Sequence, residues 1–151
     1  MQIQSIELYT DGGCSGNPGP GGWAYVLREG NNHIAQSGGQ AFTTNNKMEL
    51  TAVIKGLDHI LKTFGKGTRV TVLTDSQYVK NGISVWIFNW KRNGWKTASK
   101  DPVKNKELWI ELDALQQDLS VSWQWVKGHA GVELNELCDT LVRAEMDALK
   151  K

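Results

Sequence analysis

Ile6-Glu-Leu-Tyr-Thr-Asp11 and Val70-Thr-Val-Leu-Thr-Asp75 are two apolar runs that end in the same Thr-Asp pair. Short runs of this composition predict two β-strands, each ending in a carboxylate. Open α/β sheets place their ligand sites at the carboxyl ends of strands. Taken singly, Asp11 is equally well explained as a turn-initiating residue, and Asp75 as the N-cap of a helix. Their joint placement indicates a functional site.

The rest of the chain alternates strand-like and helical patterns around these two runs. Strands are predicted at residues 3–11, 22–29, 32–41, 69–74 and 121–126, and helices at residues 45–64, 76–92, 104–118 and 132–150. The glycines of segment 12–22 are interpreted as a turn region, Gly30-Asn-Asn32 as a hairpin connection, and Gly82 as a break in a helix. The pattern predicts an α/β fold with a single five-stranded mixed sheet flanked by helices, in one domain spanning residues 1–151.

Composition and charge limit the class of protein. The chain has 151 residues, of which 40% are hydrophobic, and no run approaches the roughly 18 apolar residues of a membrane span. Two cysteines and the lack of a visible secretory signal favour a reducing, cytoplasmic location without membrane contact. The net charge is +1, but residues 76–106 carry seven basic residues and one acid. This stretch indicates a localised polyanion contact, although on charge alone a solvated helix face is the better explanation.

Glu49 lies in the apolar face of the predicted helix at residues 45–64. On a helical wheel it falls between Ala52, Val53 and Gly56, so the pattern directs its carboxylate toward the sheet. A buried acid must be paired, neutralised or bound to metal. The alternative is a glutamate that satisfies backbone amides at the helix start, where Thr43 or Thr44 is available as the N-cap.

Two further residues near the C-terminus complete the candidate set. Asp139 lies at the border between the core face and the solvent face of the last predicted helix, where an acid is commonplace. His129 lies between glycines in a loop after the last predicted strand. A histidine on a loop near clustered carboxylates can move protons or assist product release, whereas alone it is an ordinary exposed histidine.

Several motifs, in order, resemble the bacterial type 1 ribonuclease H family, the ribonucleases HI. The matching blocks are Tyr9-Thr-Asp-Gly-Gly-Cys-Ser-Gly-Asn-Pro-Gly-Pro-Gly-Gly-Trp23, Thr43-Thr-Asn-Asn-Lys-Met-Glu-Leu50, Thr74-Asp-Ser-Gln-Tyr78, Trp86-Ile-Phe-Asn-Trp-Lys-Arg-Asn-Gly-Trp95, Pro102-Val-Lys-Asn105, Trp125-Val-Lys-Gly-His-Ala-Gly131 and Asn135-Glu-Leu-Cys-Asp139. The resemblance spans residues 6 to about 145. The resemblance implies a ribonuclease H-like fold.

The resemblance also implies an activity: endonucleolytic cleavage of the RNA strand of an RNA–DNA hybrid, leaving 3′-hydroxyl and 5′-phosphate ends. It implies that Asp11, Glu49, Asp75 and Asp139 are the metal-binding catalytic acids and that His129 is the loop histidine. Oxygen ligands select Mg²⁺, with Mn²⁺ as a substitute, over zinc. Two such ions per site with substrate suit an in-line displacement. Without metal, repulsion among the acids should raise the pKa of at least one of them.

The resemblance assigns contacts to both strands of the hybrid. Cys14, Asn17, Asn45 and Gln77 match positions near the minor groove, and Asn45 and Gln77 are the main candidates for RNA contacts. Thr44 and Asn105 match positions associated with a DNA-strand phosphate. The alternative for Asn45 is capping of the helix that follows it.

The basic stretch resembles the handle region of the family, in which basic and aromatic residues grip the DNA strand. We call residues 86–96 the handle segment; its candidate contacts are Trp86, Trp90, Lys91, Arg92 and Lys96. The alternative for the indoles is core packing, which is favoured for at least one of them.

Two other functions compete with a monomeric, Mg²⁺-dependent ribonuclease H. A non-catalytic hybrid-binding domain would gain nothing from clustered negative charge near phosphates. A DNA-acting metal nuclease, such as a resolvase or transposase core, is disfavoured by the basic handle segment and by the complete set of ribonuclease H motifs.

Overall fold

The structure, a computed structural model, describes residues 5–97, 99–126 and 133–149. In chain order the elements are β1 (Ser5–Cys14), β2 (Gly19–Glu29), β3 (Asn32–Thr43), α1 (Asn45–Phe64), β4 (Arg69–Thr74), α2 (Gln77–Asn81), the π-helical turn η1 (Gly82–Trp86), α3 (Ile87–Arg92), α4 (Lys106–Asp118), β5 (Ser120–Trp125) and α5 (Glu133–Leu149). Within the described ranges, no helix is long and apolar enough to cross a membrane.

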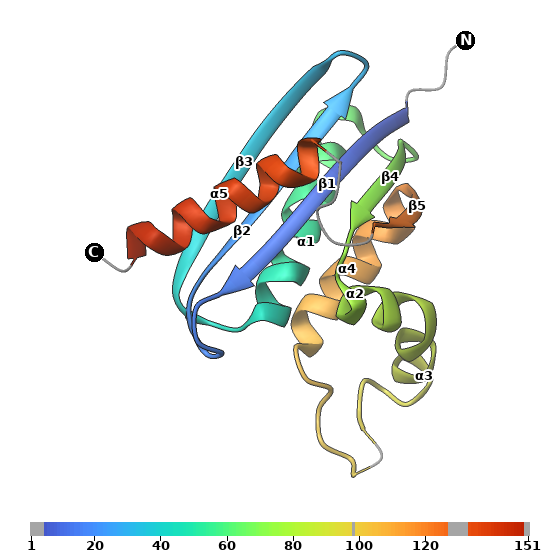
Figure 1. Cartoon of the computed structure of the whole chain (residues 1–151). Coiled ribbons are helices and arrows are strands. Elements are labelled where there is room, and N and C mark those ends of the chain that lie inside the picture. The colour runs from blue at the N-terminus through green and yellow to red at the C-terminus, as the bar shows by residue number, and fades with distance from the viewer. Residues whose placement is uncertain (1–4, 98, 127–132, 150–151) are drawn as a thin grey trace.

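The strands form one five-stranded mixed sheet in the order β3-β2-β1-β4-β5. Strands β1, β2 and β3 pair antiparallel, whereas β4 pairs parallel with both β1 and β5. Helix α5 crosses one face of the sheet, and α1 and α4 lie on the other (Figure 1). Each face therefore has its own apolar cluster: Leu57 and Trp109 belong to the α1 side, Cys138 and Val142 to the α5 side. The α/β fold and the mixed sheet predicted from the sequence are confirmed.

The interpretation of residues 12–22 as a turn region is wrong for most of that segment. Gly12 and Gly13 continue β1 and pair with Trp23 and Gly22 of β2, so the connection is only residues 15–18. The reason is tertiary packing: a Cβ at Gly12 would lie 2.4–2.5 Å from the backbone of Met48 and Glu49 in α1. The glycine therefore lets the first turns of α1 approach the central strand.

Gly82 does not break the helical segment at residues 76–92. It adopts ordinary helical angles, φ −62° and ψ −48°, at the passage from α2 into the π-helical turn η1. A Cβ at this position would lie 2.0 Å from the indole of Trp109. Glycine is thus required here because the backbone at the start of η1 packs directly on the Trp109 ring of α4.

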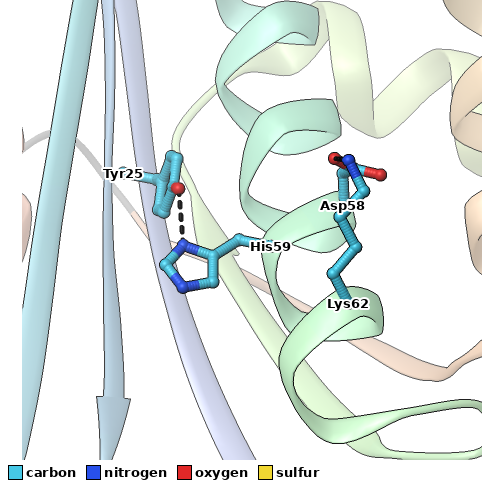
Figure 2. A network of polar contacts seen from close by, with 4 residues as sticks. All are labelled: Tyr25, Asp58, His59 and Lys62. Carbon is cyan, nitrogen blue, oxygen red and sulfur yellow. Dashed lines mark hydrogen bonds and ion pairs between the residues drawn. The ribbon is translucent and has the colours of Figure 1, made fainter.

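Helix α1 carries Glu49 and is fixed at both ends and along its length. Thr44 is the N-cap, its hydroxyl accepting a hydrogen bond from the Lys47 N–H at 3.3 Å, and Gly65 ends the helix with φ 95°. Figure 2 shows a tie to the sheet, in which Tyr25 of β2 meets His59 of α1 with 2.7 Å between the phenolic oxygen and Nδ1. Thus α1 has a fixed register against the sheet.

Candidate active site

Three of the four predicted metal ligands meet at the centre of the sheet. Asp11 lies within β1, Asp75 follows the last residue of β4, and Glu49 is in the second turn of α1. One carboxylate oxygen from each lies within 4.8 Å of the other two. Because β1 and β4 are adjacent and parallel, their carboxyl-terminal halves bring the two aspartates side by side. The three oxygens form a set of hard ligands of the kind that Mg²⁺ and Mn²⁺ prefer.

Asp139 of α5 lines the same pocket but lies outside this three-acid cluster. Its Oδ2 is 3.1 Å from Nε of Arg143, one helical turn further on. The pocket has a volume of about 510 Å³. Its lining also includes Cys14, Asn45 and Gln77. The fourth acid thus shares the pocket with the cluster without belonging to it.

The electrostatics of the cluster centre on Glu49, whose carboxyl group is buried. Burial raises the pKa of Glu49 well above its usual value of 4.5, and the neighbouring charges of Asp11 and Asp75 raise it further. Hydrogen bonds from the Gly12 N–H and the Ser76 hydroxyl act in the opposite direction. The upward shift in the pKa of Glu49 matches the expectation from the sequence, but burial contributes more to this shift than repulsion among the acids does. A divalent cation would relieve both costs.

Three of the candidate minor-groove contacts, Cys14, Asn45 and Gln77, line the pocket, and the fourth, Asn17, is bonded to Asn45. The side-chain oxygen of Asn17 accepts the backbone N–H of Asn45 at 3.1 Å, joining the β1–β2 connection to the start of α1. The Cys14 thiol lies 2.9, 3.4 and 3.2 Å from the carbonyl oxygens of Gly16, Gly19 and Thr43. Cys14 therefore organises the loop. Asn17, Asn45 and Gln77 are exposed.

Of the two candidate DNA-phosphate contacts, Asn105 lines a second groove, and Thr44 is the N-cap of α1, whose residues Lys47 and Thr51 line the same groove. The Thr44 hydroxyl caps α1, whereas Asn105 precedes α4 and lines the groove together with Lys47, Thr51 and Lys106. Two lysines at this groove provide the charge that a phosphate group requires.

The handle segment combines packing with exposed charge. Trp90 has ring-centroid distances of 5.8 Å to Trp86, 6.1 Å to Trp95 and 5.3 Å to Trp109, so core packing accounts for much of its surface. Arg92 and Lys96 are exposed. Lys91 is also exposed, and it pairs with Asp113 of α4, with 3.3 Å between Nζ and Oδ2.

The structure identifies four residues around the site that sequence reasoning did not assign. Gly12 and Ser76 donate to Glu49, Arg143 pairs with Asp139, and Tyr78 binds Asn105. Only Arg143 carried a local signal, because a basic residue four positions after an acid is a helical ion pair. His129 falls outside the described residues, so its role stays a prediction.

These observations define an α/β protein with a candidate divalent-cation site over the two central strands. The model of the RNase H family matches residues 3–147 of the chain. The Ribonuclease H of Hydrogenovibrio crunogenus is 54% identical over 147 residues, which are 97% of this chain and 99% of the relative. The Ribonuclease HI of Neisseria meningitidis serogroup B is 59% identical over 138 residues, covering 91% and 92%.

Solved structures agree with these relatives. The structure of LC9-RNase H1, described as a type 1 RNase H with the type 2 active-site motif, has a TM-score of 0.84 and 29% identity, covering 99% of this chain and 75% of that chain. The structure of LC11-RNase H1 in complex with an RNA/DNA hybrid has a TM-score of 0.70 and 26% identity, covering 97% and 99%. The chain belongs to the ribonuclease H family, whose activity is hydrolysis of the RNA in RNA–DNA hybrids.

Proposed function

We propose that this chain is an endonuclease that hydrolyses the RNA strand of RNA–DNA hybrids with two divalent ions, leaving 3′-hydroxyl and 5′-phosphate ends. The observation that carries this function is the convergence of Asp11, Glu49 and Asp75, with carboxylate oxygens within 4.8 Å of one another, in a member of the ribonuclease H family. Clustered acids beside a phosphate backbone repel it unless cations lie between them.

The residues present fit a divalent cation because the candidate ligand atoms are all carboxylate oxygens. Asp11, Glu49 and Asp75 would hold Mg²⁺, or Mn²⁺ in its place, and Asp139 is the fourth proposed ligand. When bound, two such ions supply an activated water and stabilise the leaving 3′-oxygen. The Gly12 N–H and the Ser76 hydroxyl orient the Glu49 carboxylate. His129 is the proposed group for proton movement or product release.

For substrate recognition we propose two sets of contacts. Asn45 and Gln77, which line the acid pocket, and Asn17, which is bonded to Asn45, would contact the RNA strand, with Cys14 shaping the β1–β2 loop. Thr44 and Asn105 would hold a DNA-strand phosphate. Hydrogen bonds to 2′-hydroxyls distinguish the RNA strand of a hybrid from DNA without reading bases.

Cleavage assays test the activity directly. A labelled hybrid should be cut in its RNA strand with Mg²⁺ and left intact with a chelator, while duplex DNA, duplex RNA and single-stranded RNA should resist. Binding of the hybrid without cleavage would support a binding domain instead. Cleavage of duplex DNA would support a DNA-acting metal nuclease.

Neutralising the exposed charge of the handle segment should weaken hybrid binding. The variant Lys91→Gln, Arg92→Gln, Lys96→Gln is expected to raise KM and to flatten the dependence of log Kd on log salt by about one unit per lost phosphate contact. KM and hybrid affinity across a salt series measure both effects. Lys62→Gln, Lys66→Gln, Arg69→Gln is the matched control, because these charges lie at the opposite ends of α1 and β4 from the acids. An unchanged KM and slope in the handle variant would refute the assignment.

We also propose that the protein acts as a cytoplasmic monomer, as the sequence predicts. Sedimentation analysis with and without hybrid tests the oligomeric state. A dimer at assay concentration would contradict the monomer.

A further inference from the structure

Tyr78 lies where three parts of the molecule meet. It is the second residue of α2, three positions after Asp75. Its ring lies 5.8 Å from that of Trp86 in η1 and 5.3 Å from that of Trp109 in α4, centroid to centroid. In Figure 1, α2 and α4 lie next to each other at the end of the sheet near the handle segment. Tyr78 therefore links the segment that follows Asp75 to α4, the helix that follows Asn105.

The phenolic oxygen of Tyr78 accepts two N–H groups. Asn105 donates through Nδ2 at 3.1 Å, and Trp109 donates through Nε1 at 3.0 Å. Because Trp109 is fully buried, the indole fixes the position of the oxygen. The oxygen in turn fixes the amide of Asn105, which is half-buried at the edge of the groove.

Asn105 has a conformation that helix stability does not explain. It is the N-cap of α4, yet its side chain makes no capping hydrogen bond, and its backbone is left-handed with φ 60° and ψ 28°. A capping asparagine typically contributes about 1 kcal/mol, so the chain forgoes that gain here. The side chain turns to Tyr78 instead, which leaves its carbonyl oxygen and its second N–H for another partner. Geometry held at a cost to local stability is typical of functional positions.

We propose that Tyr78 is a positioning residue for Asn105: its hydroxyl holds the amide so that the remaining N–H is presented to a DNA-strand phosphate in the groove lined by Lys47 and Lys106. This role rests on the proposed function, in which Asn105 contacts the DNA strand. Since α2 starts two residues after Asp75, the same short helix sets the position of the DNA contact relative to the acids that cut the RNA strand.

Tyr78→Phe tests this role because it removes only the hydroxyl and keeps the ring contacts. KM on a hybrid should rise about three- to tenfold, the effect of one lost hydrogen bond, with kcat unchanged. The salt slope should also stay unchanged, because neither Tyr78 nor Asn105 carries charge. Asn105→Ala should raise KM by a similar or larger factor. In the Asn105→Ala background, Tyr78→Phe should add no further rise in KM, since the group that it positions is gone.

A purely structural role gives a different result. Loss of folded protein lowers the apparent kcat and leaves KM unchanged, so thermal unfolding of each variant is measured alongside the kinetics. Tyr25→Phe is the matched control: it removes the hydroxyl that meets His59, on the side of α1 shown in Figure 2, and should leave KM at the wild-type value.

Three outcomes overturn the role of Tyr78. The first is a wild-type KM in Tyr78→Phe. The second is a rise in KM caused by Tyr78→Phe that is equally large in the wild-type background and in the Asn105→Ala background. The third is a wild-type KM in Asn105→Ala. Hybrid cleavage by the wild-type protein would stand in all three cases, so this inference fails separately from the proposed function.

Discussion

Asp11→Asn is expected to lower kcat on an RNA–DNA hybrid by roughly 10³-fold or more at saturating Mg²⁺. The substitution keeps the shape of the side chain and removes one charged ligand from a cluster whose oxygens lie within 4.8 Å of one another. Metal ions contribute several kcal/mol of transition-state stabilisation, and each 1.4 kcal/mol is about a factor of ten in rate. Asp75→Asn should have an effect of the same order.

The loss of activity should come without a loss of folding. Asp11 is 7% exposed, and replacing its charge by a neutral amide removes repulsion against Glu49 and Asp75. The metal-free variant should therefore unfold at the same temperature as the wild type or higher. Asp58→Asn is the matched control, because Asp58 forms a surface pair with Lys62 on α1 at 2.8 Å and should tolerate the change. Near-normal turnover in Asp11→Asn would refute the metal site.

The acid cluster was accessible from the sequence because each acid sits at a recognisable place in a local pattern. Asp11 and Asp75 follow apolar runs, and Glu49 interrupts the apolar face of a 20-residue helix. The period of the apolar residues and the position of the acid within that pattern are enough to predict which way such side chains point. The resemblance to ribonucleases HI then assigned them a chemistry.

Features that depend on contacts between distant segments were not accessible in this way. Gly12 looked like part of a turn because the contact that requires a glycine there, the approach of α1, involves residues 36 positions further on. Gly82 looked like a helix break because nothing local indicates the Trp109 ring. Glu145 lies within the apolar arc of α5, where its carboxylate accepts the Ser37 hydroxyl of β3 at 2.6 Å.

The partners of the substrate-binding candidates show the same limit. Lys91 looked like a free phosphate contact in the sequence, yet it pairs with Asp113, 22 residues away. In the sequence, nothing near Asn105 indicates a residue that holds its side chain in place. The residue that does so, Tyr78, lies 27 positions earlier. Local patterns predict the residue type at a site, whereas the hydrogen-bonded support is set by the tertiary fold.

Glu49→Gln should stabilise the metal-free protein and make its unfolding temperature much less sensitive to Mg²⁺. The raised pKa of Glu49 means that the folded protein keeps this proton at pH values where the unfolded chain has lost it. Stability therefore falls as the pH rises from the usual carboxyl value of 4.5 toward the folded-state pKa, and the penalty persists above it. A neutral glutamine does not pass through this titration.

The difference in unfolding temperature between Glu49→Gln and the wild type should be close to zero near pH 4 and positive at about pH 8 in chelator. For a chain of this size, each kcal/mol corresponds to roughly 2–4 °C. Saturating Mg²⁺ should raise the unfolding temperature of the wild type, because binding to the folded state alone stabilises it, and should raise that of the variant much less.

Thermal unfolding across this pH range, with chelator and with Mg²⁺, measures both effects, and Glu111→Gln on the exposed face of α4 controls for the loss of one charge. Metal binding must displace the Glu49 proton, so the apparent affinity of the wild type for Mg²⁺ should rise with pH until that carboxyl is ionised. An unfolding temperature of Glu49→Gln that follows the wild type at every pH, with the same gain from Mg²⁺, would mean that Glu49 neither carries the buried charge nor holds the ion.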